Sequence, residues 1–423
     1  MRFAPSFYFP YRYRVAIFLC LLMIITYMDR ICISLVGVRI KSDFHLTNGQ
    51  FGWALGAFSL SYALFEIPAG IWGDRIGQRA MLIRIVLWWS LFTALTGLSV
   101  GLVSLIVLRF LFGAGEAGSV PNMAAAVSRW FPKKDTSKGL SIGIAGQYMG
   151  SAIAPLIVVR LAESYGWRLP FFVNALFGLA WVVICVWWFR NNPSEMQGIS
   201  IDERVLIESN RRWLSKGQHM PWRKLFKSRS LVSLFLCFSA SQWSNYFFIA
   251  WMPVYLQEAK HFSEKDMQLT FTLVFSLAIA GSLLGGFLSD ALSRKKGLRW
   301  GRSYFGMFVL GLLGVSILTQ TLTDNHLVII CLLACGVFLQ AMHGIPSFSV
   351  CVDIAGSRAG TLSGVMNFCG QMAAFLIVIL FGQIADSAKN FNASLWVLGI
   401  VLLIGALLWL AVDPSMTLMP EEV

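Results

Sequence analysis

The chain has 423 residues, of which 57% are hydrophobic and only 13% are charged, and its mean hydropathy is +0.67. Soluble globular domains carry roughly a quarter of charged residues, so this composition excludes a soluble protein and indicates a polytopic membrane protein. The net charge of +13 does not indicate nucleic-acid binding, because most Lys and Arg residues lie in short connections between apolar runs. We therefore expect the lipid bilayer, and no nucleic acid, as a partner.

Twelve apolar segments can be placed along the chain, each near the ~20 residues that a membrane-spanning helix needs. They cover residues 15–37, 50–72, 80–100, 102–126, 138–161, 168–189, 230–256, 267–292, 302–321, 327–351, 359–386 and 392–412. The predicted fold class is all-α and integral to the membrane, with twelve transmembrane helices. An even number of crossings puts both termini on the same side of the membrane.

The distribution of Lys and Arg predicts which side that is. With the N-terminus inside, the inside connections hold 25 of these residues and the outside loops hold 7, while Arg30 and Arg109 lie within the membrane. Cytoplasmic loops carry the excess of positive charge in membrane proteins. Both termini are therefore predicted to be cytoplasmic, and the short termini and loops favour a bacterial inner membrane.

The longest polar stretch, residues 190–229, divides the chain into residues 1–189 and residues 230–423, with six apolar segments in each part. Within this stretch, residues 202–212 predict a short surface helix. The stretch could regulate the protein, but its composition is also that of a solvated cytoplasmic linker, which we favour.

Sequence similarity between the two parts indicates a repeat. Asp74 follows the second segment and Asp290 follows the eighth, 216 residues later, and each comes four residues after a glycine. The glycine-rich face of segment five contains Gln147, and that of segment eleven contains Asn367 at the corresponding place. Two six-helix bundles joined by a cytoplasmic linker are the architecture of an alternating-access transporter.

Arg109 and Glu116 are the most unusual residues of the apolar segments. They are seven residues apart, close to two helical turns, so they project from one face about 10 Å apart along the axis. A charge at membrane depth costs several kcal/mol unless it faces a partner or a water-filled cavity, and such charges usually serve a function. The alternative is an inert ion pair that clamps helices together.

Four stretches carry a resemblance to a known family. The loop that contains Gly70, Asp74, Arg75, Gly77 and Arg79 resembles the signature of the major facilitator superfamily. Three more resemble the anion:cation symporter family within it, which includes sialin, the vesicular glutamate carriers and bacterial sugar-acid transporters. These are residues 27–30 (Tyr-Met-Asp-Arg), 109–117 (Arg-Phe-Leu-Phe-Gly-Ala-Gly-Glu-Ala) and 129–132 (Arg-Trp-Phe-Pro). The resemblance extends over nearly the whole chain and implies the major facilitator fold.

The resemblance implies that Asp29 and Glu116 carry protons. A buried carboxyl group favours its neutral form and a neighbouring guanidinium favours the ionised one, so such a group can change charge state when its surroundings change. By the same resemblance, Arg30 is the main contact of the substrate carboxylate, which suits a guanidinium fork, and Arg109 is the partner of Glu116. The two arginines could exchange these roles, and Asp29 could instead form a structural salt bridge with one of them.

A set of neutral polar side chains could hydrogen-bond the hydroxyl groups of a ligand. The resemblance indicates Tyr62 and Gln147 as substrate contacts. The candidates in the second half are Gln242, Asn245, Tyr246, Ser347, Ser349, Asn367 and Gln371. Asn245, Gln147 and Asn367 are the strongest of all these candidates. For each residue the alternative is a contact between helices, which is common for single polar residues in membranes.

Glu66 and His343 are two further ionisable residues of the apolar segments, and each has more than one possible role. Glu66 lies one helical turn after Tyr62, where the family commonly has glutamine. It could change the proton stoichiometry, disfavour some anions, or act as a protonated hydrogen-bond donor. His343 could titrate near neutral pH, but we favour a neutral, hydrogen-bonded histidine.

Asp74, Arg75 and Arg79 are predicted to act in gating at the cytoplasmic mouth and not in substrate binding. In that place Asp74 could cap the N-terminus of a neighbouring helix and stabilise the outward-facing state.

We predict a proton-coupled symporter that imports a small organic anion, with a hydroxylated sugar acid as the first choice. Aromatic acids are an alternative, because Trp243, Tyr246, Phe247 and Phe248 could line the cavity. An anion exchanger, an exporter and a non-transporting membrane sensor are further alternatives. We expect no enzyme, since no metal-ligand cluster, nucleophile elbow or phosphate-binding loop is found. We expect a monomer that needs no metal or cofactor beyond the proton gradient.

Overall fold

The computed structural model describes residues 9–132, 135–208, 225, 227–355 and 359–416. The regular secondary structure in these ranges is helical, without a strand, which confirms the all-α prediction. Eleven of the described helices are long and apolar enough to cross a membrane.

The helices follow the predicted segments closely. Those of the first half are α1 (Tyr11–Leu35), α2 (Gly37–Phe44), α3 (Asn48–Ile76), α4 (Gln78–Thr96), α5 (Leu102–Glu116), α6 (Ser119–Trp130), α7 (Thr136–Tyr165) and α8 (Leu169–Trp187). Between the halves lie η2 (Pro193–Glu195) and α9 (Ile201–Glu208). Those of the second half are α11 (Arg229–Tyr246), η3 (Phe247–Trp251), α12 (Met252–Val254), η4 (Tyr255–Ala259), α13 (Glu264–Lys296), η5 (Trp300–Tyr304), α14 (Phe305–Thr319), η6 (Gln320–Leu322), α15 (His326–Ala355), α16 (Ala359–Ala388), α17 (Phe391–Leu408) and η8 (Trp409–Ala411).

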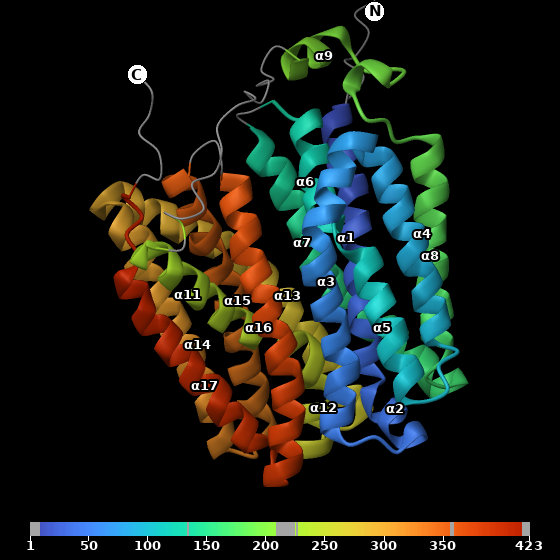
Figure 1. Ribbon diagram of the computed structural model, residues 1–423, viewed down its shortest axis with the longest axis vertical. Coiled ribbons are helices and arrows are strands. Elements are labelled where there is room, and N and C mark those ends of the chain that lie inside the picture. The colour runs from blue at the N-terminus through green and yellow to red at the C-terminus, as the bar shows by residue number, and fades with distance from the viewer. Residues whose placement is uncertain (1–8, 133–134, 209–224, 226, 356–358, 417–423) are drawn as a thin grey trace, which may run out of the picture.

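The same pattern of neighbouring helices occurs in both halves. In the first half α1 packs along α7, α3 along α5 and α4 along α8. In the second half α11 packs along α16, α13 along α15 and α14 along α17. The halves meet where α3 packs on α16 and α7 on α13, and Figure 1 shows them as two groups of helices side by side.

We name the two ends of the helices after short elements found there (Figure 1). The α2 end contains α2, the start of α3, η4 and the end of α16, and the α9 end contains α9, the start of α1 and the end of α3. At the α9 end, the backbone N–H groups of Tyr11 and Arg12 each donate to the Glu203 carboxylate of α9 at 3.0 Å. α9 is the described part of the surface helix predicted at 202–212. Residues 209–224 and 226 of the predicted linker lie outside the described residues.

The predicted segment 102–126 is not one continuous helix. α5 ends at Glu116, Ala117 has φ −52° and ψ 133°, and Gly118 adopts φ +91° before α6 begins. The Asn122 side chain donates to the Gly118 carbonyl at 2.8 Å, and a Cβ at position 118 would lie 2.5 Å from the Cβ of Ala69. Only glycine fits this backbone and this close contact. The break leaves Glu116 as the last residue of a helix, deep within the span.

The predicted segment 230–256 is also irregular. α11 ends at Tyr246, and the chain continues through the π-helical turns η3 and η4, which α12 separates. π-helical turns inside helices occur frequently at functional sites. The polar residues of α11, such as Gln242 and Asn245, lower its hydropathy, so α11 is not among the eleven apolar helices.

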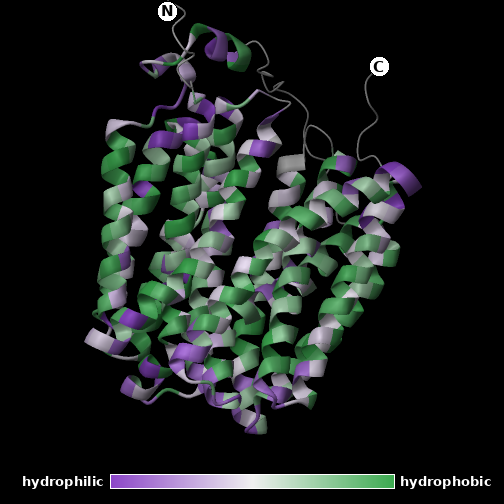
Figure 2. Cartoon of the chain, turned by 180° about the vertical axis from the view of Figure 1, so that it is seen from behind, coloured by the Kyte–Doolittle hydropathy of each residue, from purple (hydrophilic) through white to green (hydrophobic). Residues whose placement is uncertain are grey.

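Hydrophobic residues predominate along the bodies of the helices, and hydrophilic residues gather toward both ends (Figure 2). Leu91, Leu176 and Leu283 are 55%, 61% and 66% exposed on the outer faces of their helices. A continuous exposed apolar surface of this kind requires contact with lipid. The protein is therefore a multi-pass membrane protein.

α1 is held very close to α7. A Cβ at Gly150 would lie 2.4 Å from the carbonyl oxygen of Ile24, and one at Gly146 would lie 2.5 Å from that of Cys20. Small residues allow such a close approach of two backbones within a membrane. This contact fixes the part of α1 that precedes Asp29 and Arg30.

Candidate substrate and proton site

An ion pair between Arg30 of α1 and Glu116 of α5 lies at the centre of the first half. The Nε of Arg30 donates to Oε1 of Glu116 at 3.0 Å, and Nη2 donates to the same oxygen. Arg30 is 7% exposed and Glu116 is fully buried. Removal of two charges from water is costly, so a buried pair of this kind is weak evidence for stability and points to a functional role.

The structure corrects the predicted partner of Glu116, which we expected to be Arg109. Both residues lie on one face of α5, but a helical side chain is tilted toward the N-terminus of its helix. The Arg109 side chain therefore extends toward the N-terminal end of α5, and it keeps an electrostatic interaction with Glu116 without forming an ion pair with it. Arg30 reaches Glu116 from the neighbouring helix instead.

Asp29 and Arg109 form a second, looser group. Asp29 is 1% exposed, and neither of its carboxylate oxygens has a hydrogen-bond partner in the described part of the chain. The Trp89 indole lies near this carboxylate, outside hydrogen-bond geometry. The Arg109 guanidinium lies over the rings of Phe112 and Phe58, at 4.5 and 5.1 Å, and interacts electrostatically with Asp29 without a direct ion pair. A salt bridge of Asp29 with either arginine is therefore not formed in this conformation.

Aromatic rings surround the Arg30 guanidinium. Its Cζ lies 4.7 Å from the ring centre of Tyr27, 4.9 Å from that of Phe58 and 5.0 Å from that of Tyr62. Such contacts stabilise a desolvated cation, here by up to about 2 kcal/mol each. Tyr62 was predicted from the sequence as a substrate contact, and it does lie beside Arg30. Tyr27 could have been found, because it precedes Arg30 by three residues on one helix face, but no local signal indicates Phe58.

Glu66 and Asn367 connect the two halves. The Nδ2 of Asn367 on α16 donates to both carboxylate oxygens of Glu66 on α3, at 2.7 and 2.8 Å. The two residues are 301 positions apart in the chain. Sequence reasoning identified each of them separately but not their contact.

The polar residues around Tyr246 also connect to α16. The Tyr246 hydroxyl donates to Oε1 of Gln371 at 2.7 Å, and Asn245 is half-buried beside it in the chain. Phe247 and Phe248, by contrast, are buried in a cluster of aromatic rings that includes Phe381. These two rings belong to the packed interior, which removes part of the support for an aromatic substrate.

Two predicted contacts stand apart from the central group. Gln147 is half-buried, and its Nε2 lies 4.0 Å from the sulfur of Met23. Ser347 is fully buried, and its hydroxyl donates to the carbonyl oxygen of His343 at 3.3 Å within the same helix. The Gln147 amide therefore remains available to hydrogen-bond a ligand. The Ser347 hydroxyl, by contrast, does not contact Arg30 or Glu116.

His343 is held by hydrogen bonds on both ring nitrogens. Trp409 donates its indole N–H to Nε2 at 3.0 Å, and Nδ1 lies 3.0 Å from the hydroxyl of Ser241. Since the indole can only donate, Nε2 must carry a lone pair, and the imidazole is neutral with its proton on Nδ1. The structure supports the neutral, hydrogen-bonded histidine that we favoured over a titrating one.

The predicted gating residues lie at the α9 end. Asp74 and Arg75 are exposed and form no hydrogen bond or ion pair with another residue that the structure describes. The backbone N–H of Arg79 donates to Oδ1 of Asn191 at 2.8 Å, and its side chain donates to the Val186 carbonyl. Asp74 therefore caps no helix among the residues that the structure describes.

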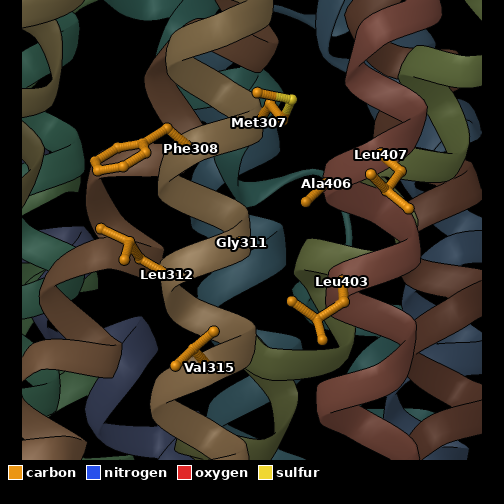
Figure 3. Close-up of a pocket in the computed structure, with 8 residues that line it drawn as sticks. All are labelled: Met307, Phe308, Gly311, Leu312, Val315, Leu403, Ala406 and Leu407. Carbon is orange, nitrogen blue, oxygen red and sulfur yellow. The ribbon is translucent and has the colours of Figure 1, made fainter.

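A groove of about 420 Å³ between α14 and α17 is lined by apolar residues alone (Figure 3). Phe308, Val315 and Leu407 on its rim are 62%, 51% and 64% exposed. The groove lies on the outer face and offers no polar group to orient a ligand, so it suits a lipid acyl chain and not an organic anion.

The sequence model of the family described as Major Facilitator Superfamily matches residues 19–378. A probable sulfoacetate transporter of Cupriavidus necator is 31% identical, over 96% of this chain and 94% of the relative. The hexuronate transporter of Bacillus subtilis is 28% identical, over 91% of this chain and 90% of the relative. The D-galactonate transporter of Escherichia coli O6:H1 is 28% identical, over 94% of each protein.

The fold is similar to that of a solved transporter. A bacterial homologue of the human lysosomal transporter Spinster, in an inward-facing and unoccupied conformation, aligns with a TM-score of 0.78 at 19% identity. The alignment covers 95% of this chain and 97% of that chain. At this identity the likeness concerns the fold alone.

Proposed function

Since the chain belongs to the major facilitator superfamily, we propose that it is a proton-coupled symporter that imports a small organic anion, a hydroxylated sugar acid, by alternating access. Its relatives are named as transporters of sulfoacetate, hexuronate and D-galactonate, which are all organic anions. The observation that carries the proposal is the buried ion pair of Arg30 with Glu116.

The pair supports a simple form of coupling. Glu116 occupies the guanidinium fork of Arg30, which is the group best suited to bind a substrate carboxylate. A proton on Glu116 removes its charge and releases Arg30 for the substrate. When the substrate leaves, Glu116 loses its proton and returns to Arg30. Proton and anion thus depend on the same guanidinium.

Asp29 is the second proton carrier in this proposal, and Arg109 sets its charge state. Asp29 is buried, neither of its oxygens has a hydrogen-bond partner in the described part of the chain, and the positive charge of Arg109 acts on it from nearby. A shift of Arg109 between conformations would therefore change the proton occupancy of Asp29.

Neutral polar side chains around the ion pair are the remaining proposed substrate contacts. Tyr62 lies beside Arg30, while Tyr246, Asn367 and Gln371 form a polar group on α11 and α16. Gln147, Asn245 and Ser347 are proposed as further contacts, of which Ser347 requires a rearrangement. Neutral polar groups opposite a guanidinium suit a ligand with one carboxylate and several hydroxyl groups.

We further propose the arrangement in the membrane. Residues 229–259 form a twelfth crossing, the bundles comprise residues 1–189 and 230–423 with the linker 190–229 between them, and the α9 end faces the cytoplasm. The excess of Lys and Arg on that side supports this orientation, and the inner membrane of a bacterium is the proposed location. Asp74, Arg75 and Arg79 then lie at the cytoplasmic mouth as gating residues. The protein is proposed to act as a monomer driven by the proton gradient, without a cofactor.

Transport by purified protein in proteoliposomes tests this function. Labelled D-galactonate should accumulate when the outside is made acidic, and an uncoupler that collapses the pH gradient should abolish accumulation. Glu116→Gln should reduce proton-driven uptake by at least a hundredfold and retain counterflow, because a permanently neutral side chain leaves Arg30 free but carries no proton.

Three outcomes would contradict the proposal. Counterflow without net uptake by the wild type favours an exchanger. Binding without any flux favours a sensor. Unchanged proton-driven uptake by Glu116→Gln removes Glu116 as a proton carrier. Asp202→Asn, on an exposed carboxylate of α9, is the matched control and should behave as the wild type.

A further inference from the structure

Glu66 is a third acid of the central region for which the coupling scheme has no role. It lies on α3 one turn after Tyr62, whose ring contacts Arg30, and it interacts electrostatically with both of these residues. It therefore faces the same space as the proposed carboxylate site. Both of its oxygens lie within 2.8 Å of the same Asn367 nitrogen, so both act as acceptors for one amide group.

The charges of this region do not balance. Two arginines, Arg30 and Arg109, are combined with three acids, Asp29, Glu66 and Glu116. With Asp29 and Glu66 ionised, one proton on Glu116 leaves the empty site neutral overall. A ligand with one anionic group then adds a single negative charge, which a proton on Asp29, the second proposed carrier, offsets. A ligand with two anionic groups would add two, in surroundings where an uncompensated charge is strongly disfavoured.

We propose that Glu66 makes the site selective for ligands that carry one anionic group, by opposing a second anionic group at the end of the ligand that lies away from Arg30. The inference rests on the proposed transport of organic anions and specifies the substrate class. It distinguishes sugar acids with one carboxylate from those with two.

The hydrogen bonds on α16 specify the other end of the ligand. Because the amide nitrogen of Asn367 faces Glu66, the carbonyl oxygen Oδ1 is left as an acceptor. One turn further along, Gln371 accepts from the Tyr246 hydroxyl through Oε1, which leaves its amide nitrogen as a donor. A polyol satisfies both groups, because each hydroxyl can donate and accept. A carboxylate can only accept, so Asn367 and Glu66 both disfavour it.

Competition between two six-carbon sugar acids tests the inference. D-galactonate has one carboxylate and galactarate has two, and the two compounds have similar size and hydroxyl content. In proteoliposomes with the full-length protein, the wild type should prefer D-galactonate at least tenfold in kcat/KM. Glu66→Gln removes the charge and keeps the size of the side chain, and it should reduce that preference at least tenfold, about 1.4 kcal/mol, mainly through better uptake of galactarate.

Controls separate charge from structure and from the proposed function. Glu66→Asp keeps the charge and should keep the preference for D-galactonate even if the bond to Asn367 is lost. Ligand-induced shifts of Tm in detergent give the same comparison if Glu66→Gln transports poorly. An unchanged preference in Glu66→Gln, or equal uptake of both acids by the wild type, overturns the inference and leaves organic-anion transport intact. No uptake of either acid by the wild type would instead count against the proposed function.

Discussion

The two ends of the molecule connect the halves in different ways. At the α2 end, charged groups of one half bind the other half directly. Arg39 forms two hydrogen bonds with Glu264, at 2.8 and 2.7 Å, and Lys41 lies 2.7 Å from both oxygens of Glu258. Asp386 of α16 accepts from the backbone N–H groups of residues 48 and 49, at 3.1 and 2.7 Å, and so caps the start of α3.

At the α9 end, the described ion pairs lie within one half each. In the second half, Arg302 donates to Asp290 and Asp353, at 2.9 Å each. Its counterpart region in the first half has exposed Asp74 and Arg75 side chains, which have no partner in the described ranges. Among the described residues, charged groups thus join the halves at the α2 end and not at the α9 end. With the proposed orientation, we propose that this difference corresponds to an inward-facing state, closed toward the outside.

Among substitutions at the α2 end, Asp386→Ala is expected to weaken the connection between the halves most. The change removes a helix cap and a connection between the halves, which is worth about 1–2 kcal/mol, a factor of roughly 5 to 30 in the ratio of the two states. The α2 end should open more often. The measurement uses a variant without its native cysteines that carries Ile379→Cys, so that a single thiol lies between the halves. A membrane-impermeant maleimide labels this thiol when the α2 end opens. Labelling should be faster in Asp386→Ala than in the parent, and the labelling rate of Asp386→Asn should lie between the two. An unchanged rate in Asp386→Ala would contradict the role of the cap.

Lys41→Met should have a smaller effect in the same assay. The Lys41 side chain is 9% exposed and its Glu258 partner is 28% exposed, so the pair is partly shielded from water. Loss of the ammonium group should favour opening by about 1 kcal/mol, roughly fivefold in labelling. Lys389→Met, at an exposed lysine of the same end, is the control and should label as the parent does. Equal labelling rates for Lys41→Met and Lys389→Met would show that opening depends on the net charge of this end and not on the ion pair of Lys41 with Glu258.

The pair of Arg39 and Glu264 should contribute least, because the two side chains are 34% and 30% exposed. A double-mutant cycle with Arg39→Gln and Glu264→Gln should give a coupling of about 0.2–1 kcal/mol, and less at high salt. Hydrogen bonding to Glu264 raises the pKa of the Arg39 guanidinium above its ordinary value. The stabilisation from this shift is present at all pH values below the ordinary pKa of arginine, so alkaline assay conditions up to about pH 9 should not change the coupling. A coupling that disappears by about pH 9 would contradict this assignment.

Asp74→Asn should leave the stability of this conformation unchanged within about 0.5 kcal/mol, since Asp74 is exposed and loses no contact with the part of the chain that the structure describes. Thermal unfolding in detergent measures this, with Arg302→Met as the contrast that should unfold at a lower temperature. A drop in Tm for Asp74→Asn comparable to that for Arg302→Met would show that the α9 end is closed after all.

Local sequence patterns predicted the positions of the spans and the residues of the central group. Apolar length predicted eleven described helices, and the charges at 29, 30, 109 and 116 do lie together inside the first half. The partners were not predictable, since they depend on which way each side chain leaves its helix. This is why Glu116 was assigned to Arg109 on its own helix, while the structure pairs it with Arg30.

Other features were hidden because they involve distant segments. The contact of Glu66 with Asn367 depends on the packing of α3 against α16, which no local pattern encodes. The break after Glu116 could have been suspected from the glycines at 113, 115 and 118, but these also fit close helix packing. Only the left-handed backbone of Gly118 distinguishes the two explanations.

The bonds of His343 have a consequence for the way the protein responds to acidity. A second proton on this ring would direct an N–H at the N–H of Trp409. Protonation of His343 on acidification is therefore disfavoured, because it would place two donors against each other. In the proposed coupling, the acids of the first half therefore respond to the pH gradient while His343 and its two partners keep one arrangement in the second half.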